Sequence, residues 1–124
     1  MGEKIENIQR RTFCFACRII RLYQFLMKKD RIYEGLCRQL IRSGTSFGAD
    51  LEEANAAQSR ADFISKCHIA LKEARETHYW LRLYQATGIV LESKLNDLIK
   101  ESNEIISILT AIVKKNKTKK RLIS

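Results

Sequence analysis

Four cysteines are the residues of this chain whose type and spacing best suit metal binding. Cys14 and Cys17 form a C-x-x-C pair, but Cys37 and Cys67 are each isolated in the sequence. A structural zinc site needs four ligands, usually in two close pairs. Cysteine is also a common small buried residue. We therefore expect reduced, packed cysteines, and neither a metal ion nor another cofactor.

Acid–base and redox-metal chemistry have weaker support. Di-iron bundle sites need Glu-x-x-His motifs on two helices, whereas this chain has Glu73-x-x-Glu76 and two histidines, His68 and His78, on one segment. Ion pairs explain the glutamates more simply, with Lys66, Lys72 and Arg75 as partners. The Tyr79–Trp80 pair could stack a nucleic-acid base, although such a pair more often belongs to a core or subunit interface. We predict no catalytic residues.

The stretch RSGTSFGADLEEA, residues 42–54, resembles a phosphate-binding loop only in its glycines. A P-loop needs a preceding strand and a lysine after the last glycine, and here Ala49 and Asp50 follow Gly48. The helical apolar spacing also crosses the stretch without a slip, at Ile32, Leu36, Leu40, Ser43, Phe47, Leu51 and Ala54. We predict one continuous helix, in which Gly44, Ser46 and Gly48 permit close packing of a neighbouring helix.

Positive charge is the strongest indication of a partner. The net charge is +9, and residues 1–42 contain ten lysines and arginines against four acids. A second basic cluster begins at Lys114, while the middle of the chain is mildly acidic. This distribution favours a polyanionic partner. The predicted phosphate-contacting residues are Arg11, Arg18, Arg21, Lys28, Arg31, Arg38, Arg42, Lys114, Lys115, Lys117, Lys119, Lys120 and Arg121.

Four helices must position these residues. Asp30 and Ser59 suit helix N-caps, and Gly88 suits a helix end. Helical periodicity, the absence of proline and the short connections predict an all-α, antiparallel up-down-up-down four-helix bundle over residues 1–115. A flexible basic tail is expected at 116–124. The predicted helices cover residues 5–27, 31–56, 60–87 and 91–115.

The N-terminal sequence is charged and lacks the apolar region of a secretory signal. The longest nearly apolar run, IISILTAIV at 105–113, is too short to span a bilayer. We expect a cytoplasmic protein that does not bind membranes.

A long motif resembles the "four helix bundle protein" family, whose members include proteins encoded in intervening sequences of bacterial large-subunit ribosomal RNA genes. It covers residues 39–81, QLIRSGTSFGADLEEANAAQSRADFISKCHIALKEARETHYWL, with further matches at Phe15–Ala16 and Leu22–Tyr23. Phe47 replaces a smaller aliphatic residue, and Asp50 replaces the usual asparagine. The resemblance implies bundles assembled into a ring, a homopentamer. It extends in architecture to the accessory protein of diversity-generating retroelements, a basic pentamer that binds nucleic acid and a reverse transcriptase.

Charge and resemblance together predict a non-enzymatic, oligomeric accessory protein that binds RNA or DNA through basic surface patches. The main alternative is a protein-binding scaffold or adaptor, for a reverse transcriptase or another mobile-element protein. An enzyme or small-molecule binder is the third possibility, and it would need a cleft with converging polar groups.

Overall fold

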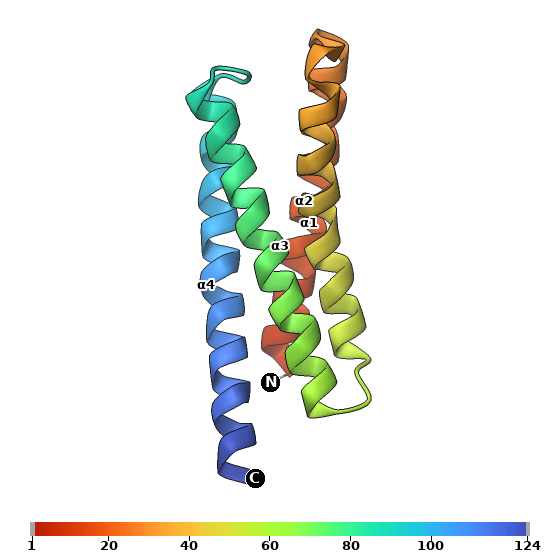
Figure 1. The fold of residues 1–124 in the computed structure, drawn as a ribbon, viewed down its shortest axis with the longest axis vertical. Coiled ribbons are helices and arrows are strands. Elements are labelled where there is room, and N and C mark those ends of the chain that lie inside the picture. The colour runs from red at the N-terminus through yellow and green to blue at the C-terminus, as the bar shows by residue number, and fades with distance from the viewer. Residues whose placement is uncertain (1, 124) are drawn as a thin grey trace.

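The computed structural model describes the backbone of residues 2–123 and the side chains of residues 7–117. The described residues form four α-helices packed in sequence as an up-down bundle, which confirms the predicted all-α class (Figure 1). The elements are α1 (Gly2–Lys29), the 3₁₀ turn η1 (Arg31–Tyr33), α2 (Glu34–Asn55), α3 (Arg60–Ala86) and α4 (Glu92–Ile123).

The helix boundaries follow the predicted capping residues. The Asp30 carboxylate accepts a hydrogen bond from the Ile32 amide at 3.0 Å, and the Ser59 hydroxyl accepts one from the Asp62 amide at 3.1 Å. Each bond satisfies an amide that a helix start leaves unpaired. Gly88 has φ of +73°, the left-handed conformation that ends helices and that glycine adopts without strain.

Helix α2 runs without interruption through the glycine-containing stretch, as predicted. Its buried residues keep the helical spacing from Cys37 to Ala54. The start of the predicted pattern is wrong at one position, because Ile32 is 77% exposed. Ile32 lies in the 3₁₀ turn, where three residues per turn shift its side chain out of phase with the apolar face of α2.

The glycines of α2 differ in how closely α1 approaches them. A Cβ added to Gly44 would lie 2.9 Å from Ile19 Cγ2, which is closer than real carbon contacts. At Gly48 the nearest atom would be Thr12 Oγ1, at an ordinary 3.4 Å. Ser46 is half-buried and donates its hydroxyl hydrogen to the Arg42 carbonyl of its own helix. Of these two glycines, Gly44 therefore has the closer contact with α1.

Helices α2 and α3 share polar contacts inside the core. Thr77 donates its hydroxyl hydrogen to Ser43 at 2.9 Å, and both residues are fully buried. The buried Tyr84 hydroxyl donates to the Leu36 carbonyl at 2.6 Å. Burial also raises the pKa of Tyr84, so its phenol stays protonated and remains a donor at neutral pH. These bonds fix the register of the two helices.

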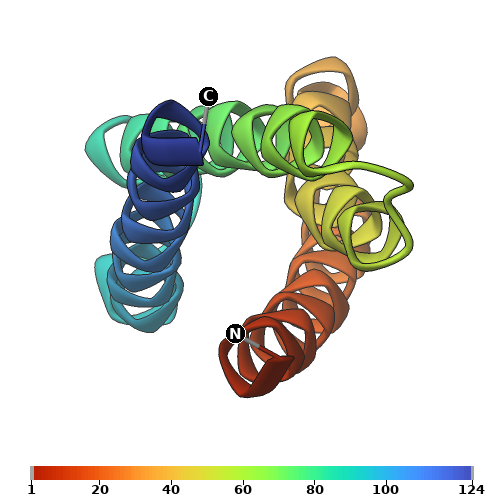
Figure 2. The same cartoon turned by 90° about the horizontal axis from the view of Figure 1, so that it is seen from below.

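The bundle is less tightly closed between its first and last helices. Seen along the bundle, the four helices follow one another around three sides, and α1 faces α4 across the fourth (Figure 2). Charged side chains among the described residues make contacts across this side. Arg11 pairs with Glu101 and Glu104 of α4, and the Lys94 ammonium lies 4.4 Å from the centre of the Phe25 ring.

Helix α4 continues past Lys115, its predicted end, to Ile123, so the backbone of the expected flexible tail is helical through that residue. Asn116 gives a physical reason for the extension. It is 2% exposed, donates to the Ile112 carbonyl at 2.8 Å and accepts a hydrogen bond from Arg60 at 3.1 Å. The Arg60 contact anchors α4 beside the start of α3.

Asp50 of α2 has a carboxylate oxygen in an unfavourable environment. Its Oδ2 atom is buried and has no hydrogen-bond partner among the described residues. Burial raises the pKa of Asp50, and the charges of Glu53 and Glu73 raise it further. Asp50→Asn should therefore increase the free energy of unfolding at pH 7, by on the order of 1 kcal/mol, because no carboxylate would remain buried beside like charges.

The stabilisation expected for Asp50→Asn should depend on pH. Because the folded protein holds the Asp50 proton more tightly than the unfolded chain, wild-type stability falls as pH rises above the ordinary carboxyl pKa of 3.8. The advantage of Asp50→Asn should shrink when urea unfolding is repeated near pH 4. Asp97→Asn, at an exposed site on α4, is the charge-matched control. Equal effects of both substitutions at both pH values would contradict this account of Asp50.

Candidate nucleic-acid interface

The candidate phosphate-contacting surface on α1 consists of Arg18, Arg21 and Lys28, which we call the α1 basic row. Arg21 and Lys28 are exposed, and Arg18 is half-buried. No carboxylate among the side chains of residues 7–117 forms an ion pair with any of the three. The row thus presents positive charge that the described part of the protein does not neutralise.

Arg11 lies on the same helix but has acidic partners. Its Nε donates to Glu101 at 3.0 Å, and its Nη2 donates to Glu104 at 2.8 Å. These contacts raise the pKa of Arg11, with the Glu101 hydrogen bond as the largest cause. Arg11 therefore joins α1 to α4, and a phosphate would have to compete with two carboxylates for its guanidinium.

The arginines at the start of the second helical segment share one acid. Arg31 and Arg38 both donate to Glu34, at 3.3 and 3.1 Å. The Arg38 hydrogen bond is the largest cause of the lowered pKa of Glu34, and the charge of Arg31 adds to it. All three lie at the surface, where such pairs are weak and screened by salt. One positive charge of the two remains uncompensated.

Arg42 forms ion pairs with two acids of α3. Its guanidinium donates to Glu73 at 3.2 Å and to Glu76. Glu76 also accepts a hydrogen bond from the Trp80 indole at 3.0 Å. The structure thus places Arg42 in a network between α2 and α3, apart from the α1 basic row.

The predicted phosphate contacts near the C-terminus lie on the last part of α4, where side chains are described through Lys117. Lys114, Lys115 and Lys117 have exposed side chains. The side chains of Lys119, Lys120 and Arg121 lie outside the described residues. The start of α1 and the end of α4 lie toward the same end of the molecule, opposite the connection between α1 and α2 (Figure 1). Positive charge is consequently distributed along the full length of the bundle.

The cysteines separate into two classes. Cys37 and Cys67 are buried in the core, as expected for packing residues. Burial raises the pKa of Cys37, and it raises that of Cys67 to about 11, so both thiols stay protonated at neutral pH. Cys14 is exposed and Cys17 half-buried, so neither belongs to the core. Across residues 7–117, no group of three or more potential ligands is placed to bind a metal ion.

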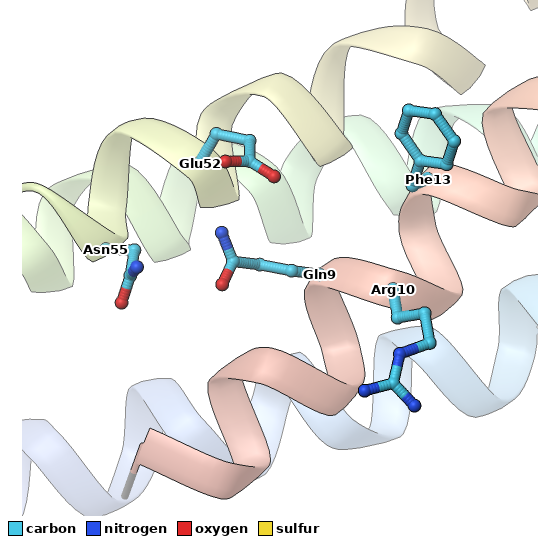
Figure 3. Close-up of a pocket in the computed structure, with 5 residues that line it drawn as sticks. All are labelled: Gln9, Arg10, Phe13, Glu52 and Asn55. Atoms are coloured by element: carbon cyan, nitrogen blue, oxygen red, sulfur yellow. The ribbon is translucent and has the colours of Figure 1, made fainter.

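A groove lies on the outer side of α1 and α2. One part has a volume of about 390 Å³, and Ala16, Gly48 and Ala49 leave space beside the exposed ring of Phe13. An adjoining part of about 520 Å³ is lined by Gln9, Arg10, Phe13, Glu52 and Asn55. Gln9 extends from α1 toward α2, whereas Arg10 turns away (Figure 3). This groove was not among the predicted sites, although small residues on two neighbouring helices, Ala16 on α1 and Gly48 and Ala49 on α2, are its sequence signal.

Residues 5–111 match the family model described as 23S rRNA-intervening sequence protein. The chain belongs to this family. A solved structure from Bacteroides thetaiotaomicron VPI-5482, described as a protein with unknown function from the S23 ribosomal protein family, is 42% identical. It aligns with a TM-score of 0.82 over 90% of this chain and 98% of that chain. No curated protein matches this family member. The comparisons thus confirm the family, and the relative's description assigns no function.

Among the described residues, no helix of this family member is long and apolar enough to cross a membrane.

Proposed function

We propose that this family member is a non-enzymatic nucleic-acid-binding accessory protein that contacts phosphates through the α1 basic row. The observation that carries the proposal is the lack of acidic partners for Arg18, Arg21 and Lys28 among the described side chains. The net charge of +9 agrees with a polyanionic partner.

The spacing of the row suits backbone contacts. At about 1.5 Å per residue, the row extends roughly 15 Å along α1. Duplex DNA carries one negative charge per about 1.7 Å of its axis. Several phosphates can therefore lie alongside the α1 basic row. Contacts of this kind position a nucleic acid but do not read its sequence. We therefore propose binding with little base selectivity at this surface.

The test is a binding titration at several salt concentrations. Labelled RNA and DNA of about 20 nucleotides, single-stranded and duplex, would be titrated with the full chain by fluorescence anisotropy. We expect the logarithm of the duplex binding constant to fall with the logarithm of salt concentration, with a slope near −3 if the three row residues each neutralise one phosphate. A slope near zero, or no binding to any of the four probes at 50 mM salt, would contradict the proposal.

Self-association is a further part of the proposal. Phe13 is 68% exposed and Ile20 is 40% exposed beside the groove, which supports a contact with another protein surface. A ring of copies, the homopentamer that the resemblance implied, would repeat the α1 basic row and raise avidity without new contacts. Light scattering measures this directly, because a pentamer would have five times the 14.4 kDa mass of one chain.

The same groove favours a second function, that of a protein-binding scaffold for a reverse transcriptase or another mobile-element protein. The small side chains along it could accept a partner helix. An apolar contact of this kind should change little between low and moderate salt, unlike phosphate binding. The salt titration therefore separates the two functions.

A further inference from the structure

The outward face of α3 carries an aromatic residue among cations. Lys72, Arg75, Tyr79 and Arg82 follow one another at steps of three or four residues, so they form one stripe along the helix. All four side chains are exposed, and Tyr79 is 50% exposed. We call these four residues the α3 stripe.

The ring of Tyr79 is held in place from one side. Trp80 contacts it edge to face, with ring centres 5.2 Å apart and planes at 68°. The Trp80 indole is fixed by its hydrogen bond to Glu76, which also accepts one from Arg42 of α2. Neighbouring contacts thus position an aromatic ring that remains half-exposed to solvent.

The cations of the stripe have no acidic partner among the described side chains. The nearby acids of α3, Glu73 and Glu76, are both paired with Arg42. Lys72, Arg75 and Arg82 form no ion pair within residues 7–117. Arg75 and Arg82 lie roughly 10 Å apart along the axis, with Tyr79 between them.

We propose that the α3 stripe binds single-stranded nucleic acid, with an unpaired base stacked on Tyr79 and neighbouring phosphates on Arg75 and Arg82. This inference rests on the proposed function and adds to it a second site and a substrate class. Aromatic rings and a basic track are the two features that sequence-tolerant single-strand binders combine. In a duplex both faces of each internal base are already stacked, so Tyr79 favours unpaired nucleotides.

The charge of the stripe argues for a polyanion over a second copy of this chain. A contact between two such faces would bring six like charges together, which is unfavourable without intervening acids. A strand of nucleic acid supplies both a negative backbone and flat aromatic surfaces. The sequence also allowed a subunit interface at Tyr79–Trp80. The test below distinguishes that interface from a nucleic-acid site.

The test compares full-length wild type, Tyr79→Ala and Tyr79→Phe by anisotropy with a labelled 20-nucleotide single strand and its duplex. Tyr79→Ala should weaken single-strand binding by about tenfold, as expected for the loss of one stacked base. Duplex binding through the α1 basic row should change little. Tyr79→Phe keeps the ring and should resemble wild type, and Tyr33→Ala removes an exposed tyrosine elsewhere as the matched control.

Trp80, the single tryptophan of the chain, provides a local readout. Its emission should change on saturation with the single strand and stay constant with the duplex. Wild-type affinity of Tyr79→Ala for the single strand would overturn the α3 site while leaving the proposed function intact. A lower assembly mass for Tyr79→Ala in light scattering would also overturn it, by assigning the face to contacts between copies. Failure of wild type to bind either probe would instead remove the proposed function, and this site with it.

Discussion

Gly44→Leu should destabilise the bundle by about 1–2 kcal/mol. A Cβ at this position would already lie 2.9 Å from Ile19, and the rest of a leucine side chain would have to enter a filled core. Overpacking of this kind typically costs about 1–3 kcal/mol, and it exceeds the gain of roughly 1 kcal/mol in helix propensity when glycine is replaced. Urea unfolding followed by circular dichroism measures the change.

Gly35 provides the matched control in the same helix. A Cβ at Gly35 would meet no atom within 4 Å, so Gly35→Leu should leave stability unchanged or raise it. A Gly44→Leu protein that unfolds at the wild-type urea concentration would contradict the close contact between α1 and α2. Light scattering on both variants would show whether the substitution also changes the mass of the assembly.

Replacing the α1 basic row by glutamine should produce the largest loss of nucleic-acid binding. The variant Arg18→Gln/Arg21→Gln/Lys28→Gln removes three cations that have no acidic partner in residues 7–117. Each lost phosphate contact should reduce the salt slope for duplex DNA by about 0.9. We expect affinity near 100 mM salt to fall by at least about tenfold while the helical circular dichroism spectrum is retained.

A second triple variant separates this surface from net charge alone. Arg31→Gln/Arg38→Gln/Lys100→Gln also removes three positive charges, two from residues that share Glu34 and one from Lys100, which is exposed on α4. Its affinity should fall less than that of the α1 variant, since ion pairs already offset part of its charge. Equal losses would indicate a diffuse electrostatic attraction and would contradict a localised site on α1.

The fold was predictable from the sequence because its determinants are local. Apolar spacing identified α2 through its glycines, and Asp30, Ser59 and Gly88 marked where helices begin or end. Two helix boundaries differ from the predicted ones because of contacts and turns that the sequence does not reveal. A 3₁₀ turn takes Ile32 out of the core, and the contact of Asn116 with Arg60 accompanies the extension of α4.

The candidate site was less predictable, because the partner of a charged residue depends on the helix packed beside it. Arg11 and Arg18 both lie on α1 and were both predicted to contact phosphates. Arg11 instead pairs with Glu101, ninety positions away in sequence, whereas Arg18 pairs with no described carboxylate. Arg42 likewise pairs with acids of α3. Periodicity along one helix gives the face on which a residue lies, but it does not identify the residues across from that face.

The central claim is that the α1 basic row contacts nucleic acid. Ultraviolet crosslinking in the cells that make the protein, followed by mass spectrometry of peptides carrying nucleotides, tests it most directly. We predict recovery of RNA or DNA attached to peptides from residues 12–28, with less of it from the Arg18→Gln/Arg21→Gln/Lys28→Gln variant. Recovery of bound proteins without crosslinked nucleotides, or undiminished crosslinking of the variant, would contradict the claim.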